Sequence, residues 1–258
     1  MARSQNKILF IVEGEKTEPK IITKYSKSIE IENEIDIEII SFKTNIYVLY
    51  KKIKELNEGF FDDSTSTIET LKSIFVEQGL HDEAKLLDEK YPYIYLMFDL
   101  EFQDGLYDDK KEVLEEMLDY FNDETDNGLL LINYPMIESF RDYKKPAPSN
   151  DFIFSKVSLS EISDYKKIVG LRGNNDNFSK YSKKDFDNVA LQNIQKANYI
   201  VNNCMIKPPY EDFINIVLGK EIFYNQFDLI DCKKEFYILC TSSFVFAYYF
   251  GKRYYDDI

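Results

Sequence analysis

Short apolar runs alternate with longer amphipathic segments along the first half of the chain. Lys7–Val12, Pro92–Phe98 and Leu129–Asn133 are apolar on both faces, whereas Ile35–Ser41 alternates between apolar and polar residues. Runs that are apolar on both faces are typical of strands buried in a parallel sheet. The segments between these strands have a helical pattern and predict helices over 17–29, 44–58, 67–90 and 108–123.

The order of these segments predicts an α/β fold, with a mainly parallel, four-stranded, Rossmann-like sheet and crossover helices on both faces. The composition changes after about residue 145. Lys144–Ser149 has the composition of a linker, and Gly170–Lys184 is polar and rich in asparagine. We therefore expect an α/β domain over 1–145 and a mostly helical region over 146–258. Helices are expected in that region at 184–204, 210–218 and 242–255.

The charge balance of the chain limits its partners. Its 258 residues include 46 acidic side chains and 32 Lys and Arg side chains, which gives a net charge of −14. Nucleic-acid-binding proteins usually carry a basic surface, so tight binding to nucleic acid is expected to need divalent cations or a basic partner. No apolar run approaches the length of a membrane span, and the N-terminus lacks the apolar core of a signal peptide. We therefore expect a cytoplasmic protein without a membrane segment.

One histidine and three cysteines restrict the metal and catalytic chemistry. A single chain cannot supply a Cys/His zinc cage or a mechanism that needs two histidines. His81 lies in a polar helical segment and is expected at the surface. Cys204, Cys232 and Cys240 lack CxxC spacing, so we expect reduced thiols and no disulfide.

Acidic residues follow three of the four predicted strands. Glu13 follows the first strand, Asp99 and Glu101 follow the third, and Glu138 lies just past the fourth. The carboxyl ends of parallel strands meet at one edge of a sheet, where α/β proteins bind ligands. Carboxylates gathered there repel one another unless a cation intervenes, and oxygen ligands suit Mg²⁺, or Mn²⁺ in its place. For each of these acids considered alone, the competing interpretation is a helix N-cap or an acidic residue in the first turn of a helix.

The segment Val12–Glu18 (VEGEKTE) resembles the opening motif of Toprim-type domains, in particular the RloB/AbiLii-like branch found in bacterial phage-defence operons. Glu13 matches the glutamate that follows the first strand in this family. Asp99 and Glu101 match its acidic pair as D-x-E, with glutamate where aspartate is usual. The resemblance covers residues 7–140. It implies Mg²⁺-dependent cleavage or transfer at nucleic-acid phosphates, with the glutamate as acid/base or ligand and the acidic pair as metal ligands.

Two further site residues are assigned beside this motif. Glu138 falls where relatives carry another acidic motif, and it is predicted to be a third-motif metal ligand. Lys16 is predicted to be a catalytic cation that offsets charge at a scissile phosphate. The competing interpretation of Lys16 is a solvated lysine in the first turn of a helix.

Basic and aromatic side chains outside the motif have two interpretations each. Arg141, Lys144, Lys145 and the segment Arg172–Lys184 are candidate contacts to nucleic acid, or solvated surface residues. Aromatic residues near the C-terminus also have two interpretations. One is that they stack on bases; the other, which we expect, is that they lie in the core or at an interface with a partner. These aromatic residues are Tyr248, Tyr249, Phe250, Tyr254 and Tyr255.

The resulting hypothesis is a metal-dependent endonuclease that acts as the toxic effector of a phage-defence (abortive infection) system. Its substrate would be RNA, tRNA included, or DNA, and the resemblance implies control by an ABC-type or AAA ATPase partner. One alternative is a non-catalytic binding or scaffold subunit of an ATPase-containing defence complex. Another is a metal-dependent phosphohydrolase for small nucleotides. The sequence leaves the substrate, the trigger and the oligomeric state open, a homodimer included.

Overall fold

A computed structural model describes residues 7–29, 35–57, 66–143, 150–171 and 180–258 of the chain. The chain forms two compact units. The first unit comprises Met1–Pro19, Glu30–Phe98 and Asp104–Leu131, and the second comprises Lys20–Ile29, Asp99–Gln103 and Ile132–Ile258. The predicted domain boundary at residue 145 lies outside the described residues and stays a prediction.

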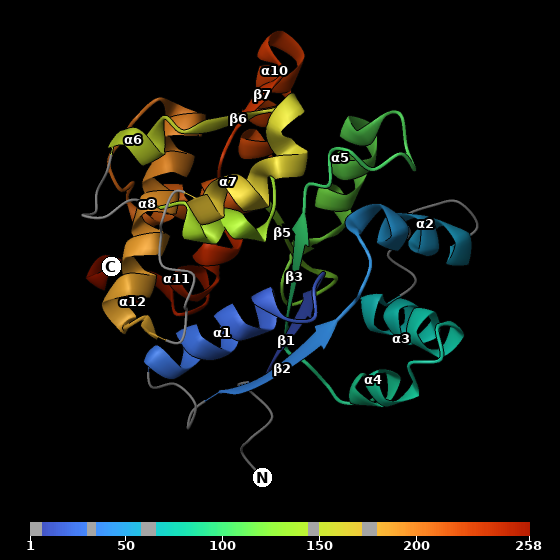
Figure 1. Cartoon of the computed structure of the whole chain (residues 1–258). Helices are drawn as coiled ribbons and strands as arrows, with labels where there is room; N and C mark the ends of the chain where they lie inside the picture. Colours follow the sequence, from blue (N-terminus) through green and yellow to red (C-terminus); the bar gives the residue numbers. More distant parts are fainter. Residues whose placement is uncertain (1–6, 30–34, 58–65, 144–149, 172–179) are drawn as a thin grey trace. The chain divides into compact units, whose positions relative to one another are not determined.

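Five strands of the described residues form the main sheet, in the order β2-β1-β3-β5-β4. Figure 1 labels four of them, β2, β1, β3 and β5. Strand β1 pairs in parallel with both β2 and β3, and β4 pairs antiparallel with β5. The α/β class and the mainly parallel sheet are therefore confirmed. The strands are β1 (Lys7–Val12), β2 (Asp36–Ser41), β3 (Tyr93–Asp99), β4 (Asn122–Asp123) and β5 (Gly128–Asn133).

The number of strands differs from the prediction of four because β4 was missed. This strand has two residues, both polar and exposed, and so carries no apolar pattern. The other four strands lie where the sequence placed them. Side chains of β1, β3 and β5 are almost all buried, as expected for strands that are apolar on both faces.

Within the described residues, five α-helices accompany these strands along the chain. Helix α2 packs against α3 and α5, and α3 packs against α4. The side chains of Asn45 and Asp109 cap α2 and α5 by accepting a hydrogen bond from the backbone N–H three residues later. The helices are α1 (Thr17–Ser28), α2 (Ile46–Leu56), α3 (Thr67–Glu77), α4 (His81–Leu86) and α5 (Lys110–Tyr120).

The prediction of a single helix over 67–90 is wrong, because the chain turns between α3 and α4. Gly79 adopts a φ of 74°, which ends α3 without the steric cost that a side chain would add. The N–H of Leu80 then donates to the carbonyl of Phe75. A helical pattern continues on both sides of this turn, so periodicity alone did not reveal it.

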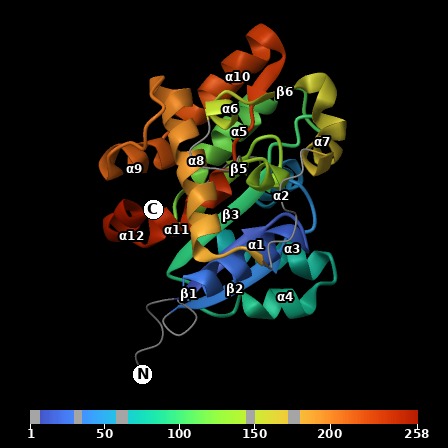
Figure 2. The same cartoon turned by 60° about the vertical axis from the view of Figure 1, so that its left-hand side comes forward.

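The C-terminal region is mostly helical, as predicted, and also contains a two-stranded antiparallel sheet of β6 (Lys156–Ser158) and β7 (Glu235–Tyr237). The helix α8 packs against α6, α9, α10 and the 3-10 helix η5. Figure 2 shows α6, α9 and α10 around α8. The α-helices are α6 (Asn150–Ile153), α7 (Tyr165–Leu171), α8 (Lys183–Asn202), α9 (Tyr210–Leu218), α10 (Glu221–Lys233), α11 (Val245–Tyr249) and α12 (Gly251–Asp257). The 3-10 helices are η2 (Ile137–Arg141), η3 (Leu159–Asp164) and η5 (Thr241–Phe244).

The helix predicted over 242–255 is divided in the structure. It consists of η5, α11 and α12, and α12 begins at Gly251, whose φ of 74° breaks the helical path after α11. None of the helices in the described ranges combines the length and the apolar character that a membrane crossing requires.

Candidate metal centre

Three of the predicted ligands meet at the carboxyl ends of β1 and β3. Glu13, Asp99 and Glu101 each offer a carboxylate oxygen, and these oxygens lie within 4.8 Å of one another. The N–H of Glu13 donates to the carbonyl of Met97 at 3.1 Å, so the pairing of β1 with β3 continues one residue past Val12. This pairing brings the end of one strand beside the end of the other, as the sequence pattern predicted.

The carboxylate of Asp99 is buried and held in one orientation. Its Oδ1 accepts hydrogen bonds from the N–H of Ile137 at 2.8 Å and from Nδ2 of Asn133 at 3.3 Å. One donor is a backbone N–H and the other is a side-chain amide, and together they fix the orientation of the Asp99 carboxylate. They also compensate for the hydration that the carboxylate loses on burial.

Glu101 has an uncommon backbone conformation for a residue with a side chain. Its φ is 43°, in the left-handed region, which costs a non-glycine residue of order 1 kcal/mol. The preceding residue, Leu100, is wholly buried, and its N–H donates to the carbonyls of Asn133 and Pro135. The chain is therefore anchored at Leu100 and turns at Glu101, whose carboxylate is partly exposed.

The donor set fits a hard divalent cation. All three groups are carboxylates, and Mg²⁺ is usually bound by one or two carboxylates together with several waters. Three carboxylates this close repel one another, and a divalent cation would offset that repulsion. Mn²⁺, which accepts the same oxygen ligands, fits equally well.

Glu138 is not part of this group of three carboxylates. Its side chain is 4% exposed and forms ion pairs with Lys166, at 2.8 Å, and with Arg141, at 3.9 Å. A buried carboxylate needs such partners, so these contacts account for Glu138 without a metal ion. Its assignment as a metal ligand stays a prediction.

The loop after β1 is held by a residue that the sequence analysis did not single out. Glu18, in the first turn of α1, is 4% exposed, and its Oε1 accepts a hydrogen bond from the N–H of Gly14 at 3.1 Å. The carbonyl of Gly14 accepts a bond from the hydroxyl of Ser41 at 2.9 Å. Both backbone groups of Gly14 are thus bonded, which fixes the residue next to Glu13. An acid in the first helical turn, four residues after a glycine, is the sequence signal that could have indicated this contact.

Replacing Gly14 by alanine is expected to reduce stability by about 1–2 kcal/mol. A Cβ at this position would lie 2.8 Å from Oε2 of Glu18 and would displace the carboxylate that Gly14 binds. Gly105→Ala is the matched control, because a Cβ there has no neighbour within 4 Å. Urea denaturation of both variants measures the difference. Equal midpoints for the two variants would show that the Glu18 contact does not stabilise the loop.

The basic side chains near this loop differ in their contacts. Lys16, the predicted catalytic cation, is exposed. Lys43 forms ion pairs with Glu83 at 3.3 Å and Glu15 at 3.4 Å, and its N–H donates to the carbonyl of Glu13. The hydrogen bond to Glu83 is the main cause of a raised pKa of Lys43. Lys43 was not predicted to be a site residue, because it follows β2 and lies far from the motif along the chain.

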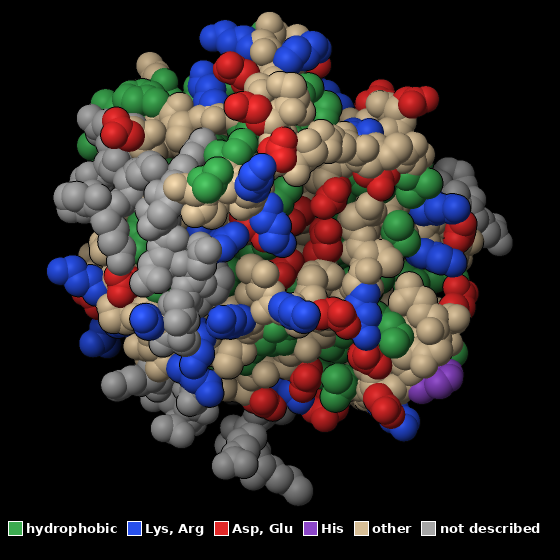
Figure 3. Space-filling model, in the orientation of Figure 1, with side chains coloured by type: hydrophobic (Ala, Val, Ile, Leu, Met, Phe, Trp, Pro, Cys, Tyr) green, Lys and Arg blue, Asp and Glu red, His purple; other side chains and the backbone are tan. Residues whose placement is uncertain are grey.

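The candidate nucleic-acid contacts are only partly described. Lys144, Lys145 and residues 172–179 lie outside the described residues, and Arg141 is paired with Glu138. Among the described side chains on the face drawn in Figure 3, Lys and Arg residues are mixed with Asp and Glu residues, and several Asp and Glu residues gather near the centre of this face. This mixture agrees with the acidic composition and gives that face no strong attraction for a polyanion.

The remaining predicted residues are placed as follows. His81 is exposed at the start of α4, which confirms a surface position. The three cysteines are free thiols, as predicted. Tyr255 is buried, and its ring stacks on Phe213 at a centroid distance of 4.8 Å. The hydroxyl of Tyr254 donates to Asp187 at 3.0 Å, so both of these C-terminal aromatic residues make contacts within the second unit.

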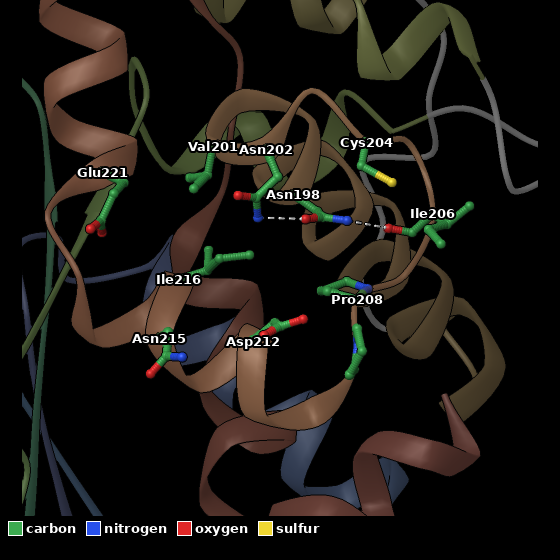
Figure 4. A pocket seen from close by; sticks show the side chains of 11 residues that line it. Asn198, Val201, Asn202, Cys204, Ile206, Pro208, Asp212, Asn215, Ile216 and Glu221 are labelled. Carbon is green, nitrogen blue, oxygen red and sulfur yellow. Dashed lines mark hydrogen bonds between the residues drawn. The ribbon is translucent and has the colours of Figure 1, made fainter.

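A cavity of about 490 Å³ in the second unit is lined by residues of α8, α9 and the segment between them, and by the first residue of α10. Figure 4 shows the amides of Asn198 and Asn202 on one side and the carboxylate of Asp212 on another. Two of the described lining residues, Asp212 and Glu221, are acidic, and none of these lining residues is a lysine or arginine. This lining does not suit a phosphate ligand.

No family model, curated protein or solved structure matches the chain in the comparisons with known proteins.

Proposed function

We propose that the chain is a Mg²⁺-dependent nuclease whose metal site is formed by Glu13, Asp99 and Glu101. The observation that supports this proposal is the convergence of three carboxylate oxygens within 4.8 Å at the ends of two paired strands. A bound Mg²⁺ would supply Lewis-acid activation of a phosphodiester and of a water molecule, without a histidine. The resemblance of the opening motif to Toprim-type domains supports nucleic acid as the substrate.

The side chains have separate roles in this proposal. Asp99 is buried and fixed by two hydrogen bonds, so it is the ligand with the most defined position. Glu13 is only partly buried and follows β1 directly, which suits a group that also exchanges a proton with water or substrate. Glu101 completes the oxygen donors from the turn after β3. Lys16, exposed in the adjacent loop, would meet a phosphate of the bound substrate.

The proposed biological role follows from the same resemblance. The chain would be a toxic effector of a phage-defence system that cleaves RNA, with tRNA as one candidate, or DNA. Its net charge of −14 agrees with control by a partner, because the chain alone would attract nucleic acid weakly. An ATPase of the ABC or AAA type is the proposed partner.

A titration with Mn²⁺ tests the metal site directly. We expect Glu101→Gln to weaken Mn²⁺ binding by about 10-fold or more, because even the partners of metal ligands contribute about 10–100-fold. Glu138→Gln is the matched control, since this carboxylate is paired with Lys166 and lies outside the cluster. Isothermal calorimetry at a fixed pH gives both affinities. A loss of affinity in the Glu138 variant would restore that residue as a ligand.

The same protein can be assayed for cleavage. We expect Mg²⁺ to support cutting of RNA or DNA by the purified chain with its partner, and EDTA to abolish it. A wild-type chain that binds no Mn²⁺ would instead favour a non-catalytic binding or scaffold subunit. The observation in favour of that second function is the acidic charge balance, which suits contact with a basic protein. Turnover of free nucleotides would identify a small-nucleotide phosphohydrolase.

A further inference from the structure

In the second unit, a segment from the C-terminal part of the chain lies along the end of β5. Tyr134 and Leu239 exchange both backbone hydrogen bonds, each at 2.8 Å. The hydroxyl of Thr241 donates to the carbonyl of Ile132 at 2.8 Å. These bonds fix Cys240 and Ser242 beside Asn133, the last residue of β5, although more than a hundred residues separate them in the sequence.

The side-chain amide of Asn133 links this segment to Asp99. Its Nδ2 donates to Oδ1 of Asp99, and its Oδ1 accepts from the thiol of Cys240 at 3.4 Å and from the N–H of Ser242 at 3.3 Å. The reverse orientation of the amide would place its oxygen against a carboxylate and its NH₂ against an N–H donor. The partners therefore determine which end of the amide faces Asp99. Asn133 is wholly buried, so water does not compete for these bonds.

Cys240 is suited to donate to the amide. It is wholly buried, and burial raises the pKa of its thiol to about 12, so the sulfur carries its proton at neutral pH. Its backbone N–H donates at 2.9 Å to Oδ1 of Asn193, a wholly buried residue of α8. Nδ2 of Asn193 in turn donates to the carbonyl of Val189 in the same helix. A chain of hydrogen bonds thus runs from α8 through Cys240 and Asn133 to Asp99.

We propose that Asn133 is a positioning residue for Asp99, and that Cys240 and α8 hold Asn133 in the orientation that this role requires. The inference rests on the proposed metal site and assigns a function to the C-terminal region. Groups that bond to a metal ligand fix its orientation, and their removal weakens metal binding. The mostly helical region would then complete the metal centre by fixing the geometry of one ligand, without contributing a ligand itself.

The test is Mn²⁺ affinity, measured by calorimetry and by electron paramagnetic resonance at a temperature where each variant is folded. We expect Asn133→Ala to bind Mn²⁺ about 10–100-fold more weakly than the wild type. Cys240→Ala, which removes one of the two donors to the amide oxygen and leaves the N–H of Ser242, should give a smaller loss, below about 10-fold. Cys240→Ser restores a hydroxyl donor and should return the affinity to near the wild-type value.

Asn198→Ala is the matched control for loss of a buried amide. Asn198 lies in α8, is 4% exposed, and bonds to the carbonyl of Ile206 and to Asn202. We expect this variant to lose stability while its Mn²⁺ affinity stays unchanged. If Asn133→Ala does not fold, the Cys240→Ala and Cys240→Ser pair tests the same chain of hydrogen bonds.

The failure of this inference differs from the failure of the proposed function. Equal Mn²⁺ affinities of wild type and Asn133→Ala, or of Cys240→Ala and Cys240→Ser, would overturn the positioning role and leave the metal site in place. A wild-type chain that binds no Mn²⁺, or that binds it as well after Asp99→Asn, would overturn the metal site and the inference with it.

Discussion

Replacing Glu13 by glutamine is expected to lower the proposed nuclease activity by about 10²–10⁴-fold, the range typical of a lost general acid or base. Glutamine keeps the size of the side chain but removes both its charge and its ability to take up a proton. The group of three carboxylates would also lose one of its members. Toxicity on induced expression in bacteria and cleavage of RNA and DNA by the purified protein measure the effect.

Glu15→Gln is the matched control for this experiment. Glu15 lies two residues away, is exposed, and pairs with Lys43 rather than joining the cluster. We expect the activity of this variant to stay within about twofold of wild type, since surface ion pairs contribute little. Thermal unfolding should give similar midpoints for both variants. Undiminished cleavage or toxicity in the Glu13 variant would refute the assignment of this glutamate.

Replacing Tyr25 by alanine is expected to reduce the stability of the second unit by about 3–5 kcal/mol, as for other large aromatic side chains in a core. Tyr25, in α1, is 1% exposed, and its ring stacks on Phe186 at a centroid distance of 4.7 Å and an interplanar angle of 9°. The same ring contacts the edge of Phe246, also at 4.7 Å. Truncation therefore leaves a cavity lined by two aromatic rings. Urea denaturation followed by circular dichroism measures the loss.

Tyr25→Phe separates packing from hydrogen bonding at this position. The hydroxyls of Tyr25 and Tyr254 lie 3.4 Å apart, and Tyr254 keeps its bond to Asp187 when Tyr25 loses its hydroxyl. We expect this variant to lose no more than about 1 kcal/mol. A phenylalanine variant as unstable as the alanine variant would show that the hydroxyl, and not the ring, provides the stability.

The sequence predicted those features that depend on neighbours along the chain. Strands such as β1 and β5 were recognised because they are apolar on both faces, and α9 because its apolar residues repeat at helical spacing. Turns were predicted less well: the break at Gly79 depends on one backbone torsion, which leaves the apolar pattern on either side unchanged. The gathering of Glu13 with Asp99 could be expected because both residues lie at the carboxyl ends of buried strands, and parallel strands bring such ends together.

Contacts between distant residues were decided by the tertiary structure alone. The sequence gives no sign that Asn133 bonds to both Asp99 and Cys240, or that Glu138 is paired with Lys166. Such contacts depend on how segments pack, and any polar residue beside a strand has many alternative partners before that packing is known. For this protein the sequence alone determined four of the five strands of the main sheet and the acidic residues near their carboxyl ends. Only the tertiary structure decided which acidic side chains meet and which buried groups form hydrogen bonds to them. A buried polar group needs a hydrogen-bond partner, and neighbours along the chain do not specify which residue that partner is.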